Sequence, residues 1–343
     1  MTHAPISSLP PVVVIGGSAG ALPALLGIVE RLRGDLPATL LVVVHIPPDQ
    51  PSVLPDLLGR AGPLPATHAR DGEVPQPGRI YVAPPDHHLL LGEGGLRLTR
   101  GPRENRSRPS IDVLFRSAAY HRGPGVAGVL LSGMQDDGAS GLWSIKHLGG
   151  AAIVQHPEEA EYPEMPLSAA RQVEVDDILP AREIGPRLNA WAVAPRPDEG
   201  EGRTTMNADD LRRIELEVGI ASEDNAFESG ILNQGPLSPF TCPECHGVLV
   251  QLREGGTTRY RCHTGHAYTA ATLLSEVRHS IETSLWQAVR ALDEDVMLLE
   301  HLGRHFEAAD QPDEARSLRA ETAEARERAR MLRGVTLRTR TAG

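Results

Sequence analysis

Hydrophobic and polar positions in residues 1–194 follow a pattern that predicts short buried strands between amphipathic helices. The predicted strands are Val12–Ile15, Thr39–Val44, Arg79–Ala83, Val126–Leu131 and Ala152–Gln155, and the predicted helices are Leu22–Leu32, Ser52–Gly59, Ile111–His121 and Ser140–His147. Strands that are apolar throughout and alternate with helices favour an α/β fold with a doubly wound, mostly parallel sheet. Two apolar runs around a glycine-rich centre predict an inserted β-hairpin at Leu89–Thr99.

The pattern changes after residue 194 and predicts three further parts. Proline, glycine and acidic residues dominate 195–238, which indicates a flexible linker that contains a short helix at Ala208–Glu215. Residues 239–270 contain short strand pairs and all the cysteines. In 271–335, apolar residues at helical spacing and a second helix that opens at Pro312 predict a helical hairpin. The apolar stripe of its first helix can pair two copies of the chain.

Composition and charge narrow the possible functions. The chain has 343 residues and a net charge of −11, which argues against nonspecific binding to nucleic acid or to an anionic membrane. No apolar run approaches the ~20 residues that a membrane helix needs, and the N-terminus lacks the pattern of a signal peptide. We therefore expect a cytoplasmic protein without membrane insertion.

The first predicted strand ends in the turn Gly16-Gly17-Ser18-Ala19-Gly20. A lone hydroxyl in such a turn can be a nucleophile, a phosphate ligand or a helix cap. The spacing Gly-x-Ser-x-Gly fits a nucleophile elbow, in which glycines let the backbone turn sharply below the serine. A serine nucleophile needs a base and a carboxylate that orients it.

Candidates for both partners follow other predicted strands, whose carboxyl ends meet at one edge of the sheet. His45 ends the second predicted strand, although a core histidine is an equal alternative. Asp136 and Asp137 lie in a glycine-rich turn after Val126–Leu131, where helix capping is the alternative.

Five motifs carry a family resemblance: VIGGSAGA, VVVHIPP, YVAPPDHHL, NRSRPSIDVLF and LLSGMQDDGASG. In this order and spacing they resemble the catalytic domain of CheB, the chemotaxis protein-glutamate methylesterase, over residues 11–192. The resemblance implies that Ser18 is the nucleophile, His45 the general base and Asp137, not Asp136, the orienting acid. It also implies that the backbone N–H of Met134 lines the oxyanion site.

The same resemblance implies a carboxylic-ester hydrolase that needs no cofactor for catalysis. Its substrates would be glutamyl methyl esters on the cytoplasmic helices of methylated chemoreceptors, and its products glutamate and methanol. Receptor glutamines would also be deamidated.

The chain departs from the family at several positions. Ala19 and Ala21 replace residues that are commonly threonine and glycine, and Gln135 stands where glycine is usual. These changes leave the three candidate catalytic residues in place. The phospho-acceptor domain that usually precedes the enzyme is not found ahead of Pro11, so we expect no control by phosphorylation of the same chain.

Two further segments carry polar groups next to predicted elements. The cationic segment Asn105–Ser110 has two interpretations: Asn105 and Arg106 dock the acidic receptor helix or the substrate, or the segment is a loop that ends in the N-cap Ser110. The run Asp86-His87-His88 predicts an exposed turn more than a metal site.

The cysteines form a pattern typical of a zinc ribbon. Cys242 and Cys245 are spaced C-x-x-C, and Cys262 and His266 are spaced C-x-x-x-H, so four ligands can close a tetrahedron. Four protein ligands leave no open position, and we therefore expect a structural Zn²⁺ ion. A similar module stands behind some CheB-like enzymes.

Two functions from different classes follow. The first is an active ester hydrolase that uses Ser18, His45 and Asp137. The second is a CheB-like partner-binding module in a sensory complex, in which the C-terminal parts recruit a partner and catalysis is secondary or lost.

Overall fold

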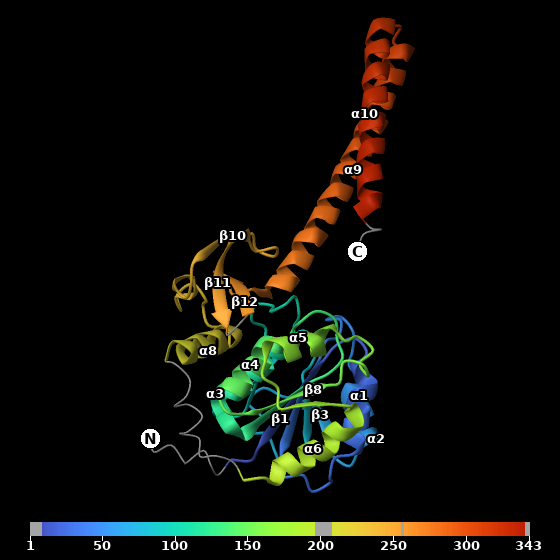
Figure 1. The fold of residues 1–343 in the computed structure, drawn as a ribbon. Coiled ribbons are helices and arrows are strands. Elements are labelled where there is room, and N and C mark those ends of the chain that lie inside the picture. The colour runs from blue at the N-terminus through green and yellow to red at the C-terminus, as the bar shows by residue number, and fades with distance from the viewer. Residues whose placement is uncertain (1–8, 196–207, 255–256, 340–343) are drawn as a thin grey trace. The chain divides into compact units, whose positions relative to one another are not determined.

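The first 195 residues contain a parallel seven-stranded sheet. The computed structural model describes residues 9–195, 208–254 and 257–339. The strands of the sheet are β1 (Val12–Gly17), β2 (Thr39–Val44), β3 (Ala66–His68), β4 (Ile80–Val82), β7 (Val126–Leu130), β8 (Ala151–Gln155) and β9 (Asp177–Leu179). Their order is β3-β4-β2-β1-β7-β8-β9, and every neighbouring pair is parallel. The predicted α/β class is confirmed, and β1 lies at the centre of the sheet (Figure 1).

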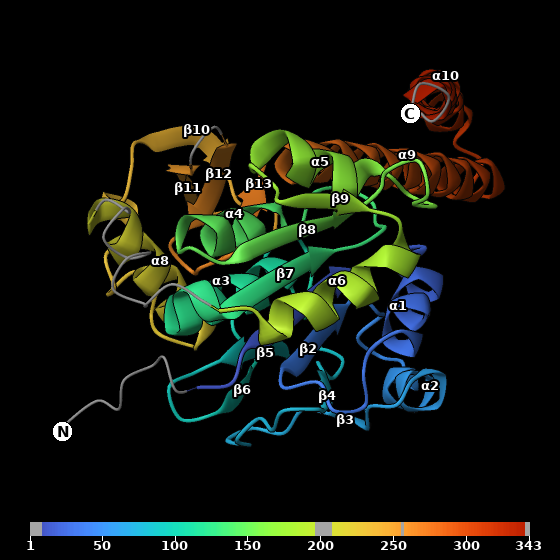
Figure 2. The same ribbon diagram turned by 60° about the horizontal axis from the view of Figure 1, so that its bottom comes forward.

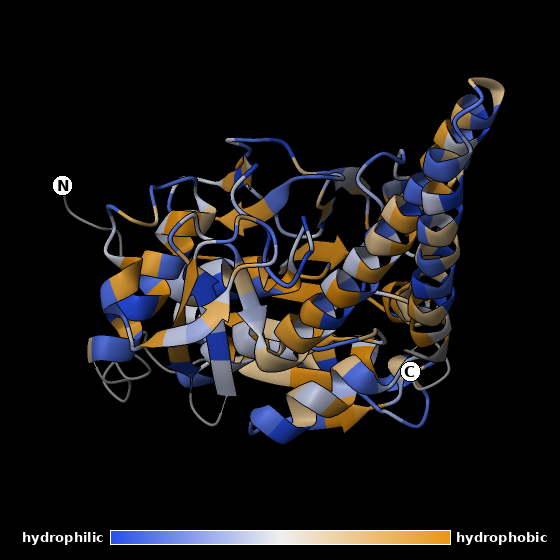
Figure 3. Ribbon diagram, turned by 90° about the horizontal axis from the view of Figure 1, so that it is seen from above, coloured by the Kyte–Doolittle hydropathy of each residue, from blue (hydrophilic) through white to orange (hydrophobic). Residues whose placement is uncertain are grey.

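Helices cover both faces of this sheet (Figure 2). One face carries α1 (Ala21–Glu30), α2 (Leu54–Ala61) and α6 (Ala181–Val193), and the other carries α3 (Ile111–Arg122), α4 (Ala139–His147) and α5 (Glu164–Gln172). The central strands are apolar because each is buried on both sides, as their hydrophobic colouring in Figure 3 shows. The predicted hairpin is β5 (His88–Leu91) paired with β6 (Leu96–Thr99).

The sequence pattern did not predict β3, β9, α5 and α6. The two strands have three residues each and are only partly buried, so they lack a long apolar run. Helix α5 holds Pro166 in its first turn and α6 holds Pro186 in its interior, and proline normally argues against a helix.

The prediction of a flexible linker at 195–238 is wrong for most of that range. Residues 196–207 lie outside the described residues, but α8 (Ala208–Ala221) is ordered and lies against α3 (Figure 2). Ile214 and Val218 of α8 are buried in the same core cluster as Leu114 and Ala118 of α3. The short helix predicted at Ala208–Glu215 is therefore present, but it extends to Ala221 and packs on the core instead of lying in a flexible linker.

A second, antiparallel sheet follows, with strand order β10-β11-β12-β13. Its strands are β10 (Leu237–Thr241), β11 (Val248–Glu254), β12 (Thr257–Cys262) and β13 (Ala267–Thr269). The predicted domain boundaries at 194 and 239 separate parts that are one body in the structure, because the first compact unit runs continuously to Leu273. Residues 1–8 of the predicted first domain lie outside the described residues.

The second compact unit, Leu274–Gly343, consists of most of α9 (Ala270–Ala308) together with α10 (Pro312–Thr339). Within it, Val289 of α9 and Ala315, Ala325 and Ala329 of α10 are buried. The helical hairpin was thus predicted from its periodicity. Pairing of two copies through α9 stays a prediction. None of the helices in the described ranges combines the length and hydropathy that crossing a bilayer requires.

Candidate active site

Ser18 follows β1, where the connections after two neighbouring strands go to opposite faces of the sheet. After β1 the chain turns to α1 on one face, and after the neighbouring β7 it turns to α4 on the other face. Such a switch point at the carboxyl ends of parallel strands is the usual site for ligands in an open α/β sheet. The backbone N–H of Ser18 donates to the carbonyl oxygen of Ser132 at 2.9 Å, which fixes the turn against β7.

Ser18 does not cap α1. The N-cap of α1 is Gly20, which has φ +70°, and no side chain donates or accepts a capping bond there. A Cβ at Gly20 would lie 2.7 Å from Cβ of Glu161 and 2.8 Å from Oγ of Ser132, so the turn requires glycine for conformation and for space. The half-buried hydroxyl of Ser18 therefore has no capping role.

His45 lies beside Ser18 because β1 and β2 are paired in register. Gly17 pairs with Val44, and the backbone N–H of His45 donates to the carbonyl oxygen of Gly17 at 3.1 Å. The imidazole is 19% exposed, and its Nε2 lies 2.8 Å from Oδ2 of Asp137. Because a carboxylate accepts this bond, Nε2 carries the proton and Nδ1 is the acceptor nitrogen of the neutral ring.

Asp137 is the buried acid that contacts His45. Its Oδ2 also accepts the backbone N–H of Ile111 at 2.8 Å, and its Oδ1 accepts Oγ–H of Ser110 at 2.9 Å and the N–H of Asp112 at 3.3 Å. The carboxylate thereby satisfies the N-terminus of α3. Burial raises the pKa of Asp137, but the hydrogen bond and charge of His45 and the donors of Ile111 and Asn105 lower it to below its ordinary value. The group is therefore a carboxylate at neutral pH.

A second buried acid, Asp112, lies next to Asp137 and was not predicted. Its Oδ1 accepts the backbone N–H groups of Gly138 at 3.0 Å and Gly141 at 2.7 Å, which satisfies the N-terminus of α4. Burial raises the pKa of Asp112 well above its ordinary value, and the negative charge of Asp137 raises it further. The available signal was an aspartate inside the apolar run IDVLF, where a charge is unexpected unless it has a partner.

Asn105 joins the two acids. Its Nδ2 donates to Oδ2 of Asp112 at 3.0 Å and to Oδ1 of Asp137 at 3.1 Å, while its Oδ1 accepts the backbone N–H of Thr269 at 3.0 Å. The residue is 3% exposed. The structure thus contradicts the interpretation that Asn105 docks a receptor or substrate, since its amide is buried and bonded on both sides.

Asp136, in the same glycine-rich turn, is buried as well. It is 5% exposed, and its Oδ1 accepts the hydroxyls of Thr269 at 2.8 Å and Thr272 at 3.2 Å. These two residues lie at the junction of β13 and α9. The two neighbouring aspartates therefore face different partners: Asp137 faces His45 and α3, and Asp136 faces the second sheet.

A small hollow of about 160 Å³ opens beside His45. It is lined by His45, Ile46, Pro48, Arg103, Arg106, Ser107, Arg108 and Pro109. Arg108 is held by Asp86 through bonds of 2.7 and 2.9 Å. Three arginines thus make the surroundings of His45 cationic, and Arg106, a predicted substrate residue, is among them. Met134, the predicted oxyanion residue, lies in the turn after β7 with its side chain 56% exposed.

The prediction of an exposed turn at Asp86-His87-His88 is wrong for His88. This side chain is fully buried, with Nδ1 accepting the backbone N–H of Ser110 at 3.2 Å and Nε2 donating to the carbonyl oxygen of Pro102 at 3.0 Å. Burial lowers its pKa to about 4, so the ring is neutral at physiological pH. Ser110 is the N-cap of α3 as predicted, but its hydroxyl donates to Asp137.

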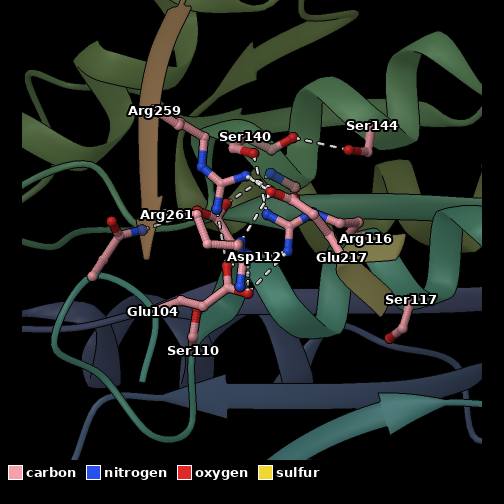
Figure 4. A network of polar contacts seen from close by, with 12 residues as sticks. Glu104, Ser110, Asp112, Arg116, Ser117, Ser140, Ser144, Glu217, Arg259 and Arg261 are labelled. Carbon is pink, nitrogen blue, oxygen red and sulfur yellow. Dashed lines mark hydrogen bonds and ion pairs between the residues drawn. The ribbon is translucent and has the colours of Figure 1, made fainter. Parts of the chain in front are cut away.

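A buried network of six charges joins the second sheet to α8, α3 and the loop before α3 (Figure 4). Arg259 of β12 contacts Glu217 of α8 at 2.8 Å and Glu104 at 3.0 Å. Arg261 contacts Glu104 at 2.6 Å, and Arg116 of α3 contacts Glu217 at 2.8 Å. The arginines outweigh burial and hold the pKa of Glu104 well below its ordinary value.

Glu254 of β11 is the sixth member of this network. It lies 2.8 Å from Arg259 and accepts Oγ–H of Ser140 in α4 at 2.5 Å. Three glutamates thus balance three arginines, and all six side chains are at most 4% exposed. Removal of one partner from such a network leaves an uncompensated buried charge, so substitution of a single member is expected to destabilise the packing of 208–273 on the α/β core.

The four predicted metal ligands meet at one place. Sγ of Cys242, Cys245 and Cys262 and a nitrogen of His266 all lie within 4.8 Å of one another. We name these four residues the Cys3His cluster. Nδ1 of His266 is 3.7 Å from Sγ of Cys242 and 3.6 Å from Sγ of Cys262, and Cys245 and Cys262 are 3.5 Å apart at sulfur.

These separations fit a tetrahedral ion. Bonds of about 2.3 Å to sulfur and about 2.0–2.1 Å to nitrogen place tetrahedral ligand atoms about 3.6–3.8 Å apart. The other nitrogen of His266, Nε2, lies 3.3 Å from the carboxylate of Glu244. A carboxylate behind a ligating histidine fixes its tautomer, as is common in metal sites. The cluster is therefore compatible with a bound metal ion.

Comparisons with known proteins agree with this geometry over the first half of the chain. A 194-residue stretch is 34% identical to the protein-glutamate methylesterase/protein-glutamine glutaminase of Yersinia pestis bv. Antiqua, and covers 55% of each protein. A 186-residue stretch is 39% identical to the corresponding Burkholderia pseudomallei protein 2, with 54% of each covered. The chain thus spans about half the length of the curated relatives it matches.

A solved structure and a family profile agree with these relatives. The crystal structure of the Thermotoga maritima CheB methylesterase catalytic domain is similar, with a TM-score of 0.52 and 33% identity over 98% of that domain and 53% of this chain. The profile of CheB methylesterases matches residues 13–188, which are just over half of the 343 residues. The chain therefore belongs to the CheB methylesterase family.

Proposed function

We propose that the protein hydrolyses glutamyl methyl esters on chemotaxis receptors and releases methanol, with Ser18, His45 and Asp137 as its catalytic triad. One observation carries this proposal: the 2.8 Å contact of His45 Nε2 with Asp137, at the strand ends that flank Ser18. Family membership supports the same chemistry. The cytoplasmic helices of receptors are the substrates, so the protein acts in the cytoplasm.

The reaction proceeds in two halves. Oγ of Ser18 attacks the ester carbonyl carbon while its proton passes to Nδ1 of His45. The carbon–oxygen bond to the methoxy group then breaks, and His45 returns the proton to the leaving oxygen, so methanol departs. Water attacks the resulting acyl-enzyme along the same path, and glutamate and free Ser18 are regenerated. A receptor glutamine would follow this path with ammonia as the leaving group.

Asp137 and the turn at 133–134 stabilise the charges that form. The carboxylate of Asp137 holds Nε2–H of His45 and stabilises the imidazolium that arises during attack. A Cβ at Gly133 would lie 3.0 Å from Cβ of Ser18, so this turn lies directly against the nucleophile. The backbone N–H of Met134, one residue further, is the proposed donor to the oxyanion.

The cationic hollow beside His45 suits an acidic substrate. Receptor segments that carry glutamyl esters also carry free glutamates, and the arginines at 103, 106 and 108 line the hollow. Opposite charge steers such a helix to the site and aligns it there. Arg106 is therefore proposed to contact the receptor.

The Cys3His cluster is proposed to bind one structural Zn²⁺ ion. Three thiolates and one imidazole are a donor set that zinc prefers, and four protein ligands leave no position for a substrate or water. When bound, the ion supplies folding energy to 239–270, since its ligands converge only in the folded unit. Every group proposed to act on the ester, including the backbone N–H of Met134, belongs to the α/β domain.

The test is methanol release from receptor cytoplasmic fragments that carry methylated glutamates. Wild-type protein is expected to release methanol, and the Ser18→Ala variant to release none above the blank. If folded wild-type protein binds the fragments but releases no methanol, the protein is a partner-binding module and the proposed hydrolase activity is wrong. If it neither binds nor hydrolyses them, another substrate must be sought.

A further inference from the structure

The second sheet reaches the active site through its edge strand β13. Residues 103–105 run beside β13: the N–H of Ala267 donates to the carbonyl oxygen of Arg103 at 3.2 Å, and the N–H of Asn105 donates to the carbonyl oxygen of Ala267 at 2.8 Å. The N–H of Thr269 donates to Oδ1 of Asn105 at 3.0 Å. Both the backbone and the side chain of Asn105 are therefore held by β13.

Asn105 needs such support because its backbone is unfavourable. It has φ +48° and the next residue, Arg106, has φ +66°, both in the left-handed region. Non-glycine residues persist there only where their surroundings hold them, although asparagine tolerates it best. The bonds from Ala267 and Thr269 supply part of that support. Asn105 is thereby fixed with its Nδ2 toward the two acids.

The amide of Asn105 in turn holds the acid of the proposed triad. Its two N–H groups bridge Asp112 and Asp137, and so fix the positions of the two carboxyl groups relative to each other. Asp137 positions His45 through a single 2.8 Å bond. A small displacement of Asp137 therefore moves the base away from Ser18.

The Cys3His cluster lies at the other end of this chain of contacts. The metal ligand His266 immediately precedes β13, and its carbonyl oxygen accepts the N–H of Cys262 at 3.0 Å. Because β13 has three residues only, its path depends on how firmly His266 is held. A bound ion would hold it through Nδ1.

We propose that Asn105 is a positioning residue for the triad and that occupancy of the Cys3His cluster, transmitted through β13, controls the rate of ester hydrolysis. The metal unit is thus part of the catalytic machinery without contact to the substrate. This inference rests on the proposed function for its kinetic consequence. It predicts that the metal and Asn105 affect kcat through the same contacts, from β13 through Asn105 to Asp137.

The kinetic test compares kcat and KM of the wild type and of Asn105→Ala, each with zinc and after its removal. Asn105→Ala is expected to lower kcat about 10- to 100-fold with little change in KM, the effect of a lost hydrogen bond to a charged group. Chelation of zinc from the wild type lowers kcat to a similar extent, and chelation of the Asn105→Ala protein lowers it no further. Additive losses would overturn the shared path.

The matched control is Asn189→Ala. Asn189 makes the same kinds of bonds, accepting the N–H of Arg33 at 3.0 Å and donating to the carbonyl oxygen of Arg31 at 2.8 Å, far along the chain from the site. This variant is expected to keep the wild-type kcat in both states. A loss equal to that of Asn105→Ala would show a general structural effect and contradict the inference.

A second readout needs no turnover. In Ser18→Ala protein, the Nε2–H proton of His45 and the backbone amide of Ile111 both report on Asp137. Zinc removal is expected to broaden the His45 resonance and to speed hydrogen exchange at Ile111, while circular dichroism shows that the helices of the α/β core stay folded. Unchanged signals, or collapse of the whole fold, would overturn the proposal. Absence of methanol release by the wild type would instead refute the proposed function.

Discussion

Asp137 and Asp112 make reciprocal bonds between two helices: Asp137 accepts a backbone N–H at the start of α3, and Asp112 accepts one at the start of α4. Asp137, just before α4, accepts the N–H of Ile111 in α3, and Asp112, in α3, accepts the N–H of Gly138 before α4. Packing of α3 against α4 therefore fixes the position of the Asp137 carboxylate, which contacts His45. The acid is fixed by two helices at once and has little freedom to reorient.

Replacement of the proposed nucleophile is expected to abolish hydrolysis without harm to the fold. Ser18→Ala removes a half-buried hydroxyl that caps no helix, so the free energy of unfolding stays near that of the wild type. Turnover should fall by about three orders of magnitude or more. Methanol assays and thermal melts measure the two quantities, and a variant with wild-type turnover would refute the assignment.

The two neighbouring aspartates should give different phenotypes. Asp137→Asn offers His45 an amide in place of a carboxylate, so the wrong tautomer is favoured and kcat is expected to fall about 10⁴-fold. Asp136→Asn disturbs a buried contact to Thr269 and Thr272, and should cost about 1 kcal/mol of stability. Its folded form should keep most of the wild-type kcat. Equal catalytic losses in the two folded variants would contradict this division.

The buried charge network predicts a large stability loss from one substitution. Arg259→Met leaves Glu104, Glu217 and Glu254 with two arginines instead of three, and should cost about 3–5 kcal/mol. Arg290→Met, in the exposed pair with Glu294, is the matched control and should leave the denaturation midpoint unchanged. Urea unfolding of both variants decides the matter, and similar midpoints would show that the network adds little.

The isolated first part of the chain is expected to be unstable. A fragment that ends at residue 194 leaves Glu104 and Arg116 without their partners from α8 and β12. A fragment that ends at Leu273 keeps these contacts and should unfold cooperatively. Solubility and circular dichroism of the two fragments test this. A stable, active 1–194 fragment would restore the view that the later segments are separate domains.

Buried His88 predicts a loss of stability in mild acid. Its pKa is about 4 in the folded chain against an ordinary 6.5, so the unfolded chain takes up a proton first as the pH falls. Stability from this residue is full above pH 6.5 and declines toward pH 4, by about 3 kcal/mol in all. His88→Gln should flatten this part of the pH profile, and the exposed His301→Gln should not. Parallel profiles of wild type and His88→Gln would contradict the assignment.

The sequence by itself determined the order of the main strands and helices, and it pointed to Ser18, His45 and Asp137. Buried parallel strands must be apolar, and their carboxyl ends must meet, so glycine-rich turns and polar residues at those ends mark a site. The Cys3His cluster could also be predicted, because its ligands come in two pairs, C-x-x-C and C-x-x-x-H, whose members are close in the chain.

Only the tertiary structure decided how residues 208–273 relate to the α/β core and what holds the acid. The contacts of Asn105 with Thr269 and of Glu104 with Arg261 join residues more than 150 positions apart. Charged residues that pair in the interior look like surface residues in a sequence, because no periodic pattern distinguishes them. Their burial becomes favourable only when the fold brings opposite charges together, and so it is decided by packing.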